Sequence, residues 1–175
     1  IPGNKAIAFG NSIDYCIFKV LSSEDISNEG QKYLVAKSLL EEVCDKCKIK
    51  EFEIIQTIKG EKLSNTICNH PFSNIGFDYE VPLLEAEFVE DSEGTGFVHI
   101  APCYGEDDYY LALENNILIK DIVKDDGCYK DNTPIFAGIH VFKAHLTVIE
   151  KLKEHNGFVG SREYSHSYPH SWRSK

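Results

Sequence analysis

The run of residues 94–110, GTGFVHIAPCYGEDDYY, groups several residues that could do chemistry. It joins a Gly-Thr-Gly turn, one histidine in a short β-prone segment, a proline that stops this segment, and three consecutive acids. Such residues could cradle a phosphate, bind a metal ion, or form a pocket for a cationic ligand. These alternatives differ in what they require of the neighbouring residues.

The turn Gly94-Thr95-Gly96 lacks the pattern of a phosphate-binding loop. Such loops need more glycines and a lysine followed by serine or threonine, or a third glycine that opens a helix, and neither is present. The predicted helix that follows opens with acids, which would repel a phosphate at its N-terminus. A tight turn before a strand is enough to explain both glycines.

His99, Asp107 and Asp108 leave three interpretations open. They could be ligands of a hard metal ion. They could equally be a strand histidine followed by two acids that favour the start of a helix. A third interpretation is a pocket at a strand-to-helix junction, where the histidine lines the wall and one carboxylate binds a cationic group. The spacing alone does not choose among them.

No other part of the chain predicts a catalytic or metal site. The serines and cysteines lack a nucleophile-elbow pattern. Cys44-Asp45-Lys46-Cys47 has a metal-like spacing, but a zinc site would normally show a second such pair. This pair also falls in a predicted helix. We therefore expect no metal and reduced cysteines.

Composition and charge narrow the class of protein. A length of 175 residues predicts a single domain over residues 1–175. The net charge of −10 argues against broad binding to a nucleic-acid backbone, but allows contact with one nucleotide end in a pocket. No apolar run reaches the roughly 18 residues of a membrane helix, and the amino end does not resemble a signal peptide. These features predict a cytoplasmic protein with no membrane partner.

Many short strands and three helices must position the 94–110 run. Strands are predicted over residues 5–9, 14–21, 33–35, 52–58, 81–89, 96–100, 119–123 and 158–164. Helices are predicted over residues 36–47, 106–115 and 142–155. Residues 61–80 have no clear period. The strands are too irregularly spaced for a doubly wound sheet, so we predict an α+β domain with a small barrel or bent sheet and peripheral helices.

The run GTGFVHIAPCYGEDDYY closely resembles the GTG-x-VH-x-AP-x-x-G-x-x-D-[YF] signature in the editing domain of isoleucyl-tRNA synthetase, a class I aminoacyl-tRNA synthetase. The resemblance continues in order along the chain. The further matching segments are IPGN at residues 1–4, DY at 14–15, IKGEKL at 58–63, HPF at 70–72 and HSYPHSWR at 166–173. The Tyr-Gly-Glu-Asp-Asp version looks like the eukaryotic-type branch. His99 and Ala101-Pro102 favour the isoleucyl over the related valyl and leucyl domains.

The resemblance implies a β-barrel-like editing domain with helices around it. This synthetase is a known example of weak single-site discrimination combined with double-sieve editing. The implied activity is post-transfer, and also pre-transfer, hydrolysis of valine wrongly attached to tRNA(Ile). Its partners would be the 3′ end of that tRNA and the rest of the synthetase. The domain would be a monomer without a cofactor, whereas the full-length enzyme would use ATP and magnesium.

The resemblance also assigns roles to residues. Asp108 aligns with the key aspartate of the family and would hold the α-ammonium group of the aminoacyl ester. His99 aligns with the histidine that lines the amino-acid pocket and helps to exclude isoleucine. Water would attack the ester carbonyl without an acyl-enzyme. Asp107 becomes a helix-start acid. The remaining substrate-binding residues implied are Gly94, Thr95, Gly96, Phe97 and Val98, of which strand alternation sends only one of the last two to the pocket side with certainty.

Some positions depart from the family pattern. Cys103-Tyr104 replaces the Gly-His of the bacterial signature, and Ser171 and Ser174 stand where we expect cysteines. The threonine-rich strand that forms a pocket wall in the family would end immediately before Ile1. We therefore predict a folded domain with impaired hydrolysis. The alternatives are a tRNA-positioning module that no longer hydrolyses, and a valyl-type editing domain.

Overall fold

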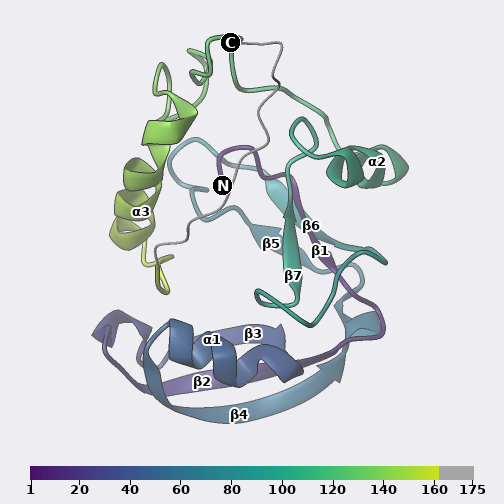
Figure 1. The fold of residues 1–175 in the computed structure, drawn as a ribbon, viewed down its shortest axis with the longest axis vertical. Coiled ribbons are helices and arrows are strands. Elements are labelled where there is room, and N and C mark those ends of the chain that lie inside the picture. The colour runs from purple at the N-terminus through teal and green to yellow at the C-terminus, as the bar shows by residue number, and fades with distance from the viewer. Residues whose placement is uncertain (162–175) are drawn as a thin grey trace, which may run out of the picture.

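The computed structural model describes residues 1–161, which fold into two β-sheets with helices around them (Figure 1). This arrangement confirms the predicted α+β class. Residues 162–175, and with them the HSYPHSWR segment, Ser171 and Ser174, lie outside the described residues. Within residues 1–161, no helix combines the length and the apolar character needed to cross a membrane.

The first sheet has four strands in the order β5 (Ile67–Asn69), β6 (Glu80–Glu85), β1 (Ala6–Phe9) and β7 (Phe97–Ile100). β1 pairs in parallel with β6 and antiparallel with β7, so the sheet is mixed. Ile7 lies opposite His99 in this register. β7 is therefore an edge strand, and one of its sides is open to other residues or to a ligand.

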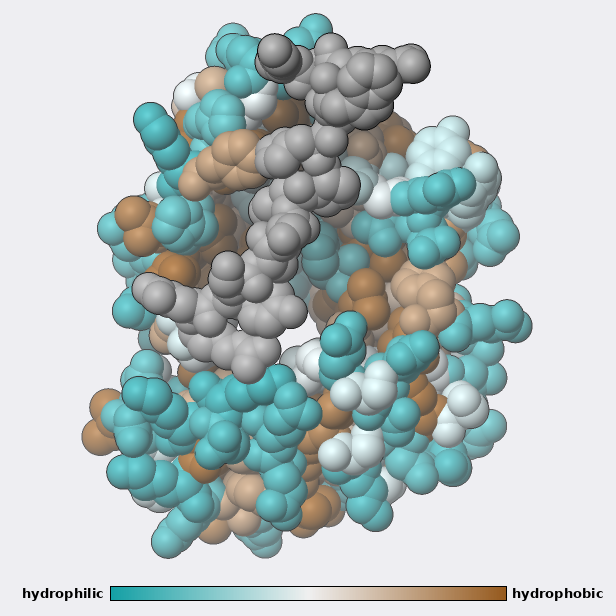
Figure 2. All heavy atoms as spheres, viewed as in Figure 1, coloured by the Kyte–Doolittle hydropathy of each residue, from teal (hydrophilic) through white to brown (hydrophobic). Residues whose placement is uncertain are grey.

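The second sheet is antiparallel and has the order β3 (Lys32–Ala36), β2 (Asp14–Ser23) and β4 (Ile49–Lys59). Helix α1 (Leu40–Lys46) covers one face of it (Figure 1). The helix buries Leu40, Val43 and Cys44, which share one helical face at spacings of three and four. The part of the molecule formed by α1 and this sheet is covered mainly by hydrophilic residues in Figure 2.

The two sheets meet at the turn before β7. The hydroxyl of Tyr15, which is fully buried on β2, donates to the carbonyl of Gly96 at 2.8 Å and accepts from the N–H of Gly10 at 2.9 Å. The N–H of Ala36, at the end of β3, donates to the carbonyl of Thr95 at 2.8 Å. One hydrophobic core runs through both sheets, so the 94–96 turn is held from the side of the second sheet.

A second hydrophobic cluster lies under the C-terminal helix α3 (Ala144–Glu154). His70 packs against this cluster: its ring stacks on Phe77 with a centroid separation of 4.8 Å, and its side chain is 1% exposed. Nδ1 of His70 accepts from the N–H of Phe72 at 3.1 Å. The members of the cluster are Phe72, Phe77, Ile122, Tyr129, Phe136 and Ala144.

Several predicted elements differ from the structure. β5 lies inside residues 61–80, where no strand was predicted, because three residues are too few to show a period. The predicted helix over 36–47 begins as a 3-10 turn at Lys37–Leu39 before α1. Residues 119–123 form no strand and contribute only the isolated bridge between Val123 and Tyr129. Residues 158–161 form no strand, and 162–164 lie outside the described residues.

Candidate functional site at the start of β7 and the β7–α2 junction

The two glycines of the turn have different structural roles. Both lie in the left-handed region, with φ of +70° at Gly94 and +75° at Gly96. A Cβ on Gly96 would lie 2.3 Å from the Cβ of Ala36, so the close approach here is to the second sheet. A Cβ on Gly94 would meet nothing within 4 Å. The backbone at Gly94 is thus the part of the turn that a substrate could approach.

A cleft of about 890 Å³ opens beside β7. Phe97 and Val98 both lie on its wall, although strand alternation predicted only one of them with certainty. The reason is that β7 is an edge strand, so its open side is reached from both faces of the pleat. The lining consists of Glu42, Lys46, Phe88, Glu90, Glu93, Gly94, Phe97, Val98 and His99. Four of the predicted substrate-binding residues therefore share one cleft, whereas Thr95, Gly96 and Asp108 do not line it.

The cleft has an acidic rim. Glu90 accepts a hydrogen bond from the hydroxyl of Ser92 at 2.9 Å, and Glu42 pairs with Lys46 one turn along α1. Glu93 adds a third carboxylate. This distribution disfavours a phosphate and favours a cationic group, in agreement with the absence of a phosphate-loop pattern.

His99 presents an exposed imidazole on β7. Desolvation by the surrounding protein lowers the pKa of His99 from its ordinary value, and the carboxylate of Asp108 opposes this shift. The imidazole is therefore neutral near pH 7. A neutral ring can line a pocket for an apolar side chain at lower cost than a charged one.

Asp108 lies in the first turn of α2 (Glu106–Glu114), which begins after Gly105. Its Oδ2 accepts a hydrogen bond from the N–H of Ala101 at 2.8 Å, which fixes the turn between β7 and the helix. A Cβ on Gly105 would lie 3.0 Å from the Cγ of Asp108, so the residue before the helix is tightly packed against this carboxylate. Within residues 1–161, Oδ1 of Asp108 has no hydrogen-bond partner and could accept one from a ligand.

Asp107 lies apart from this arrangement. It lines a separate cleft of about 480 Å³ with residues of β6 and α2, including Glu85 and Glu114. Across residues 1–161, no group of three or more His, Cys, Asp or Glu side chains has an arrangement that could hold a metal ion. The carboxylate of Asp108 is close enough to His99 to influence its pKa, but Asp108 does not line the cleft that His99 lines. Asp107 lies in the first turn of the helix.

The chain has relatives of known function along its whole length. No protein-family model matches it. The isoleucine–tRNA ligase of Pelagibacter ubique is 47% identical over 175 residues, which are 100% of this chain and 19% of that protein. That of Gluconobacter oxydans is 38% identical and covers 100% of this chain and 20% of the relative.

The chain is homologous to isoleucine–tRNA ligases along its whole length. It spans about a fifth of the length of these relatives. Both relatives come from bacteria and do not support the eukaryotic-type branch, which stays a prediction.

The fold is that of the CP1 editing domain of class I synthetases. The solved structure of GlLeuRS-CP1 superposes with a TM-score of 0.69 at 16% identity, covering 93% of this chain and 81% of that chain. The editing domain of the P. falciparum cytosolic leucyl-tRNA synthetase superposes with a TM-score of 0.51 at 16% identity, covering 65% and 43%. At this identity the likeness concerns the fold alone.

Tyr104, one of the departures from the synthetase signature, has a structural role. Its hydroxyl donates to Oδ1 of Asp121 at 3.0 Å and accepts from the N–H of Ile122 at 3.1 Å. Burial is the main cause that raises the pKa of Tyr104 to about 12, so the phenol stays protonated. This residue ties the β7–α2 turn to the segment that follows α2.

The acidic residues of the cleft were not identified from the ligase-like signature. Glu93 immediately precedes the Gly-Thr-Gly turn and Glu90 lies shortly before it, so their position in the sequence could have suggested them. Glu42 and Lys46 lie on α1, about fifty residues earlier in the chain, and only the packing of the second sheet brings them to β7. No local pattern in the sequence indicates that contact.

Proposed function

We propose that the chain is the editing domain of an isoleucyl-tRNA synthetase, and that it hydrolyses valine from mischarged tRNA(Ile) in the cytoplasm. The observation that carries the proposal is the arrangement at the β7–α2 junction. Asp108 keeps Oδ1 without a partner in the described residues, and its carboxylate acts electrostatically on the imidazole of His99. The homology to isoleucine–tRNA ligases and the CP1 fold support the same assignment.

We propose the following part for each residue. Oδ1 of Asp108 accepts a charge-assisted hydrogen bond from the α-ammonium group of the aminoacyl ester. His99 lines the space for the amino-acid side chain and limits its size. Water attacks the ester carbonyl, the bond to the tRNA oxygen breaks, and valine and the free 3′ hydroxyl leave. Catalysis then comes from positioning the ester and stabilising the developing oxyanion, and no covalent enzyme intermediate is required.

The acidic charge of the cleft supports binding of a cationic amino group there. The carboxylates of Glu90 and Glu93 attract a cationic group and repel the tRNA backbone. The chain as a whole carries a net charge of −10. The tRNA and the rest of the synthetase are therefore its proposed partners, with most of the tRNA affinity supplied outside this cleft.

One observation favours a second candidate, a tRNA-positioning module without hydrolytic activity. The carboxylate of Asp108 already serves the protein's own backbone through Ala101. Calorimetry with a non-hydrolysable valyl-adenosine analogue separates the two functions, with the measurement made on the chain and on a version extended at its amino end. The editing proposal predicts binding that is lost in Asp108→Asn. No binding to either wild-type protein would leave only the positioning module.

A further inference from the structure

A second pocket, of about 450 Å³, lies on a different part of the fold from the β7 cleft. It is formed where the amino-terminal segment, the chain before β6, the segment after α2 and the turn at 132–134 come together. None of its residues lines the β7 cleft. Its volume falls in the usual range of small-molecule sites, about 300–1,000 Å³.

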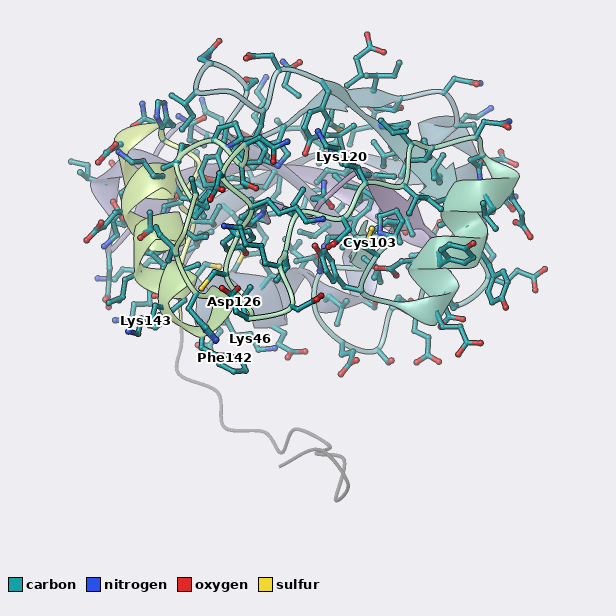
Figure 3. The ribbon with its side chains drawn as sticks, turned by 90° about the horizontal axis from the view of Figure 1, so that it is seen from above. Lys46, Cys103, Lys120, Asp126, Phe142 and Lys143 are labelled. Atoms are coloured by element: carbon teal, nitrogen blue, oxygen red, sulfur yellow. The ribbon has the colours of Figure 1, made fainter. Side chains whose placement is uncertain are left out.

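Two lysines line this pocket, Lys5 immediately before β1 and Lys120 in the segment after α2. Lys120 is labelled in Figure 3. Burial lowers the pKa of Lys5, and the positive charge of Lys120 lowers it further, so the two ammonium groups interact across the pocket. Neither forms an ion pair with a carboxylate of residues 1–161. Glu80 is the single acid among the lining residues, and it lies beyond ion-pair distance of both lysines.

Neighbouring contacts hold Lys5 in place. Its Nζ lies 3.8 Å from the centroid of the Tyr79 ring, a cation–π contact. The hydroxyl of Tyr79 donates to the carbonyl of Asn4 at 2.7 Å, and burial raises the pKa of Tyr79 to about 12. The phenol is therefore neutral and cannot neutralise the lysines. These contacts hold the ammonium group of Lys5 against the ring of Tyr79, which is itself fixed by its hydrogen bond to Asn4.

The other residues that line the pocket carry no charge apart from Glu80. Asn116 and Asn132 are the asparagines among its lining residues. Gly76 has a φ of +104°, and a Cβ there would lie 2.6 Å from the Cβ of Pro134, so these two segments pack closely at the rim. Most of the other lining residues are apolar, among them Phe77, Ile117 and Leu118, so the two lysines are the dominant charged groups of the pocket and Glu80 is its single acid.

We propose that this pocket binds a phosphate group, either of a free nucleotide or of an RNA backbone. Bringing two ammonium groups together without a counter-ion is unfavourable, and a phosphate between them would remove that repulsion and gain two charge-assisted contacts. The acidic β7 cleft cannot hold such a group. The proposal goes beyond ester hydrolysis and does not depend on it.

The test measures binding of three probes to the chain by calorimetry at low salt: AMP, adenosine, and a single-stranded RNA octamer. AMP is expected to bind at least about tenfold more tightly than adenosine, since a charge-assisted contact contributes about 1.5–3 kcal/mol. Lys120→Ala should weaken AMP binding by about tenfold. Lys50→Ala removes the same charge from exposed β4, far along the chain from the pocket, and should have less than about a twofold effect.

The outcomes separate cleanly. Lysine-dependent binding of AMP alone identifies a free nucleotide as the source of the phosphate, and tighter lysine-dependent binding of the octamer identifies an RNA backbone. Equal binding of adenosine and AMP would overturn the proposal, as would equal losses in Lys120→Ala and Lys50→Ala. Lys5→Gln is a second variant, and circular dichroism checks that its fold is retained. Hydrolysis is not measured, so the result is independent of the editing proposal.

Discussion

Oδ2 of Asp108 accepts a hydrogen bond from the N–H of Ala101 at 2.8 Å, and this contact joins the end of β7 to the first turn of α2. The same carboxylate is the group that we expect to bind the substrate's ammonium through its other oxygen. One residue thus has a structural and a proposed functional role. Substitutions can separate them, because an amide keeps the acceptor and loses the charge.

Asp108→Ala is expected to lower the free energy of unfolding by about 1–3 kcal/mol, since it leaves the N–H of Ala101 without its partner. Asp108→Asn should cost less than about 1 kcal/mol, because the amide oxygen can still accept this hydrogen bond. Urea unfolding measures both values. Asp107→Ala is the matched control and should change stability little, since Asp107 makes no such contact within residues 1–161. Equal losses for the two alanine variants would contradict the structural role of Asp108.

Gly96→Ala is expected to destabilise the protein by about 2–4 kcal/mol, because it combines a left-handed backbone with overpacking against Ala36. Gly94→Ala shares the left-handed backbone but meets open space, and should cost only about 1–2 kcal/mol. Thermal or urea unfolding of the two variants measures the difference. If both substitutions cost the same, the close packing of Gly96 against Ala36 would be contradicted.

His70 predicts a pH dependence of stability. Burial lowers the pKa of its imidazole, and Nδ1 must stay unprotonated to accept from the N–H of Phe72. The folded state therefore binds fewer protons than the unfolded state below the ordinary histidine pKa of about 6.5. Stability should be fully present above that pH and decrease as the pH falls from about 7 to 5.

Unfolding measured across this range in wild type and in His70→Gln checks the prediction, with the slope expected to flatten in the variant. His145→Gln removes an exposed histidine and should leave the slope unchanged. An unchanged slope in His70→Gln would show that another group causes the pH dependence.

His99→Ala is expected to relax the exclusion of isoleucine, because it removes the ring that limits the amino-acid side chain. Discrimination between side chains that differ by one methylene is worth about 1–3 kcal/mol, or roughly 10–200-fold in rate. The variant should lose discrimination of about this size. Deacylation of isoleucyl-tRNA(Ile) by full-length synthetase carrying this variant is the measurement. Continued rejection of isoleucine at the wild-type level would remove His99 from this role.

The sequence predicted the helices and strands that are long enough to show a hydrophobic period. β2 and α3 carry apolar residues at strand and helix spacing over ten residues or more, and both were found near their predicted bounds. β5 could not be predicted, because its three residues are specified by pairing with β6. The approach of Lys46 to β7 is likewise a tertiary contact between segments distant in the chain.

The candidate site shows the same division. The 94–110 run located His99 and Asp108, and the resemblance supplied roles that stay predictions. Both turn glycines were predicted to allow close approach of a substrate. In the structure, Gly96 packs against Ala36, and only Gly94 has open space beside it. Local sequence could not separate them, since both have the same backbone conformation and differ only in what the rest of the fold places beside them.

The central claim is tested most directly by deacylation of valyl-tRNA(Ile) with full-length synthetase, comparing wild type with Asp108→Asn. The amide preserves the contact to Ala101 and removes the charge proposed for the ammonium group. We predict a fall in the hydrolysis rate of about 10–100-fold, equivalent to a lost charge-assisted contact of about 1.5–3 kcal/mol, with unchanged aminoacylation. Hydrolysis by Asp108→Asn at the wild-type rate would contradict the proposed site.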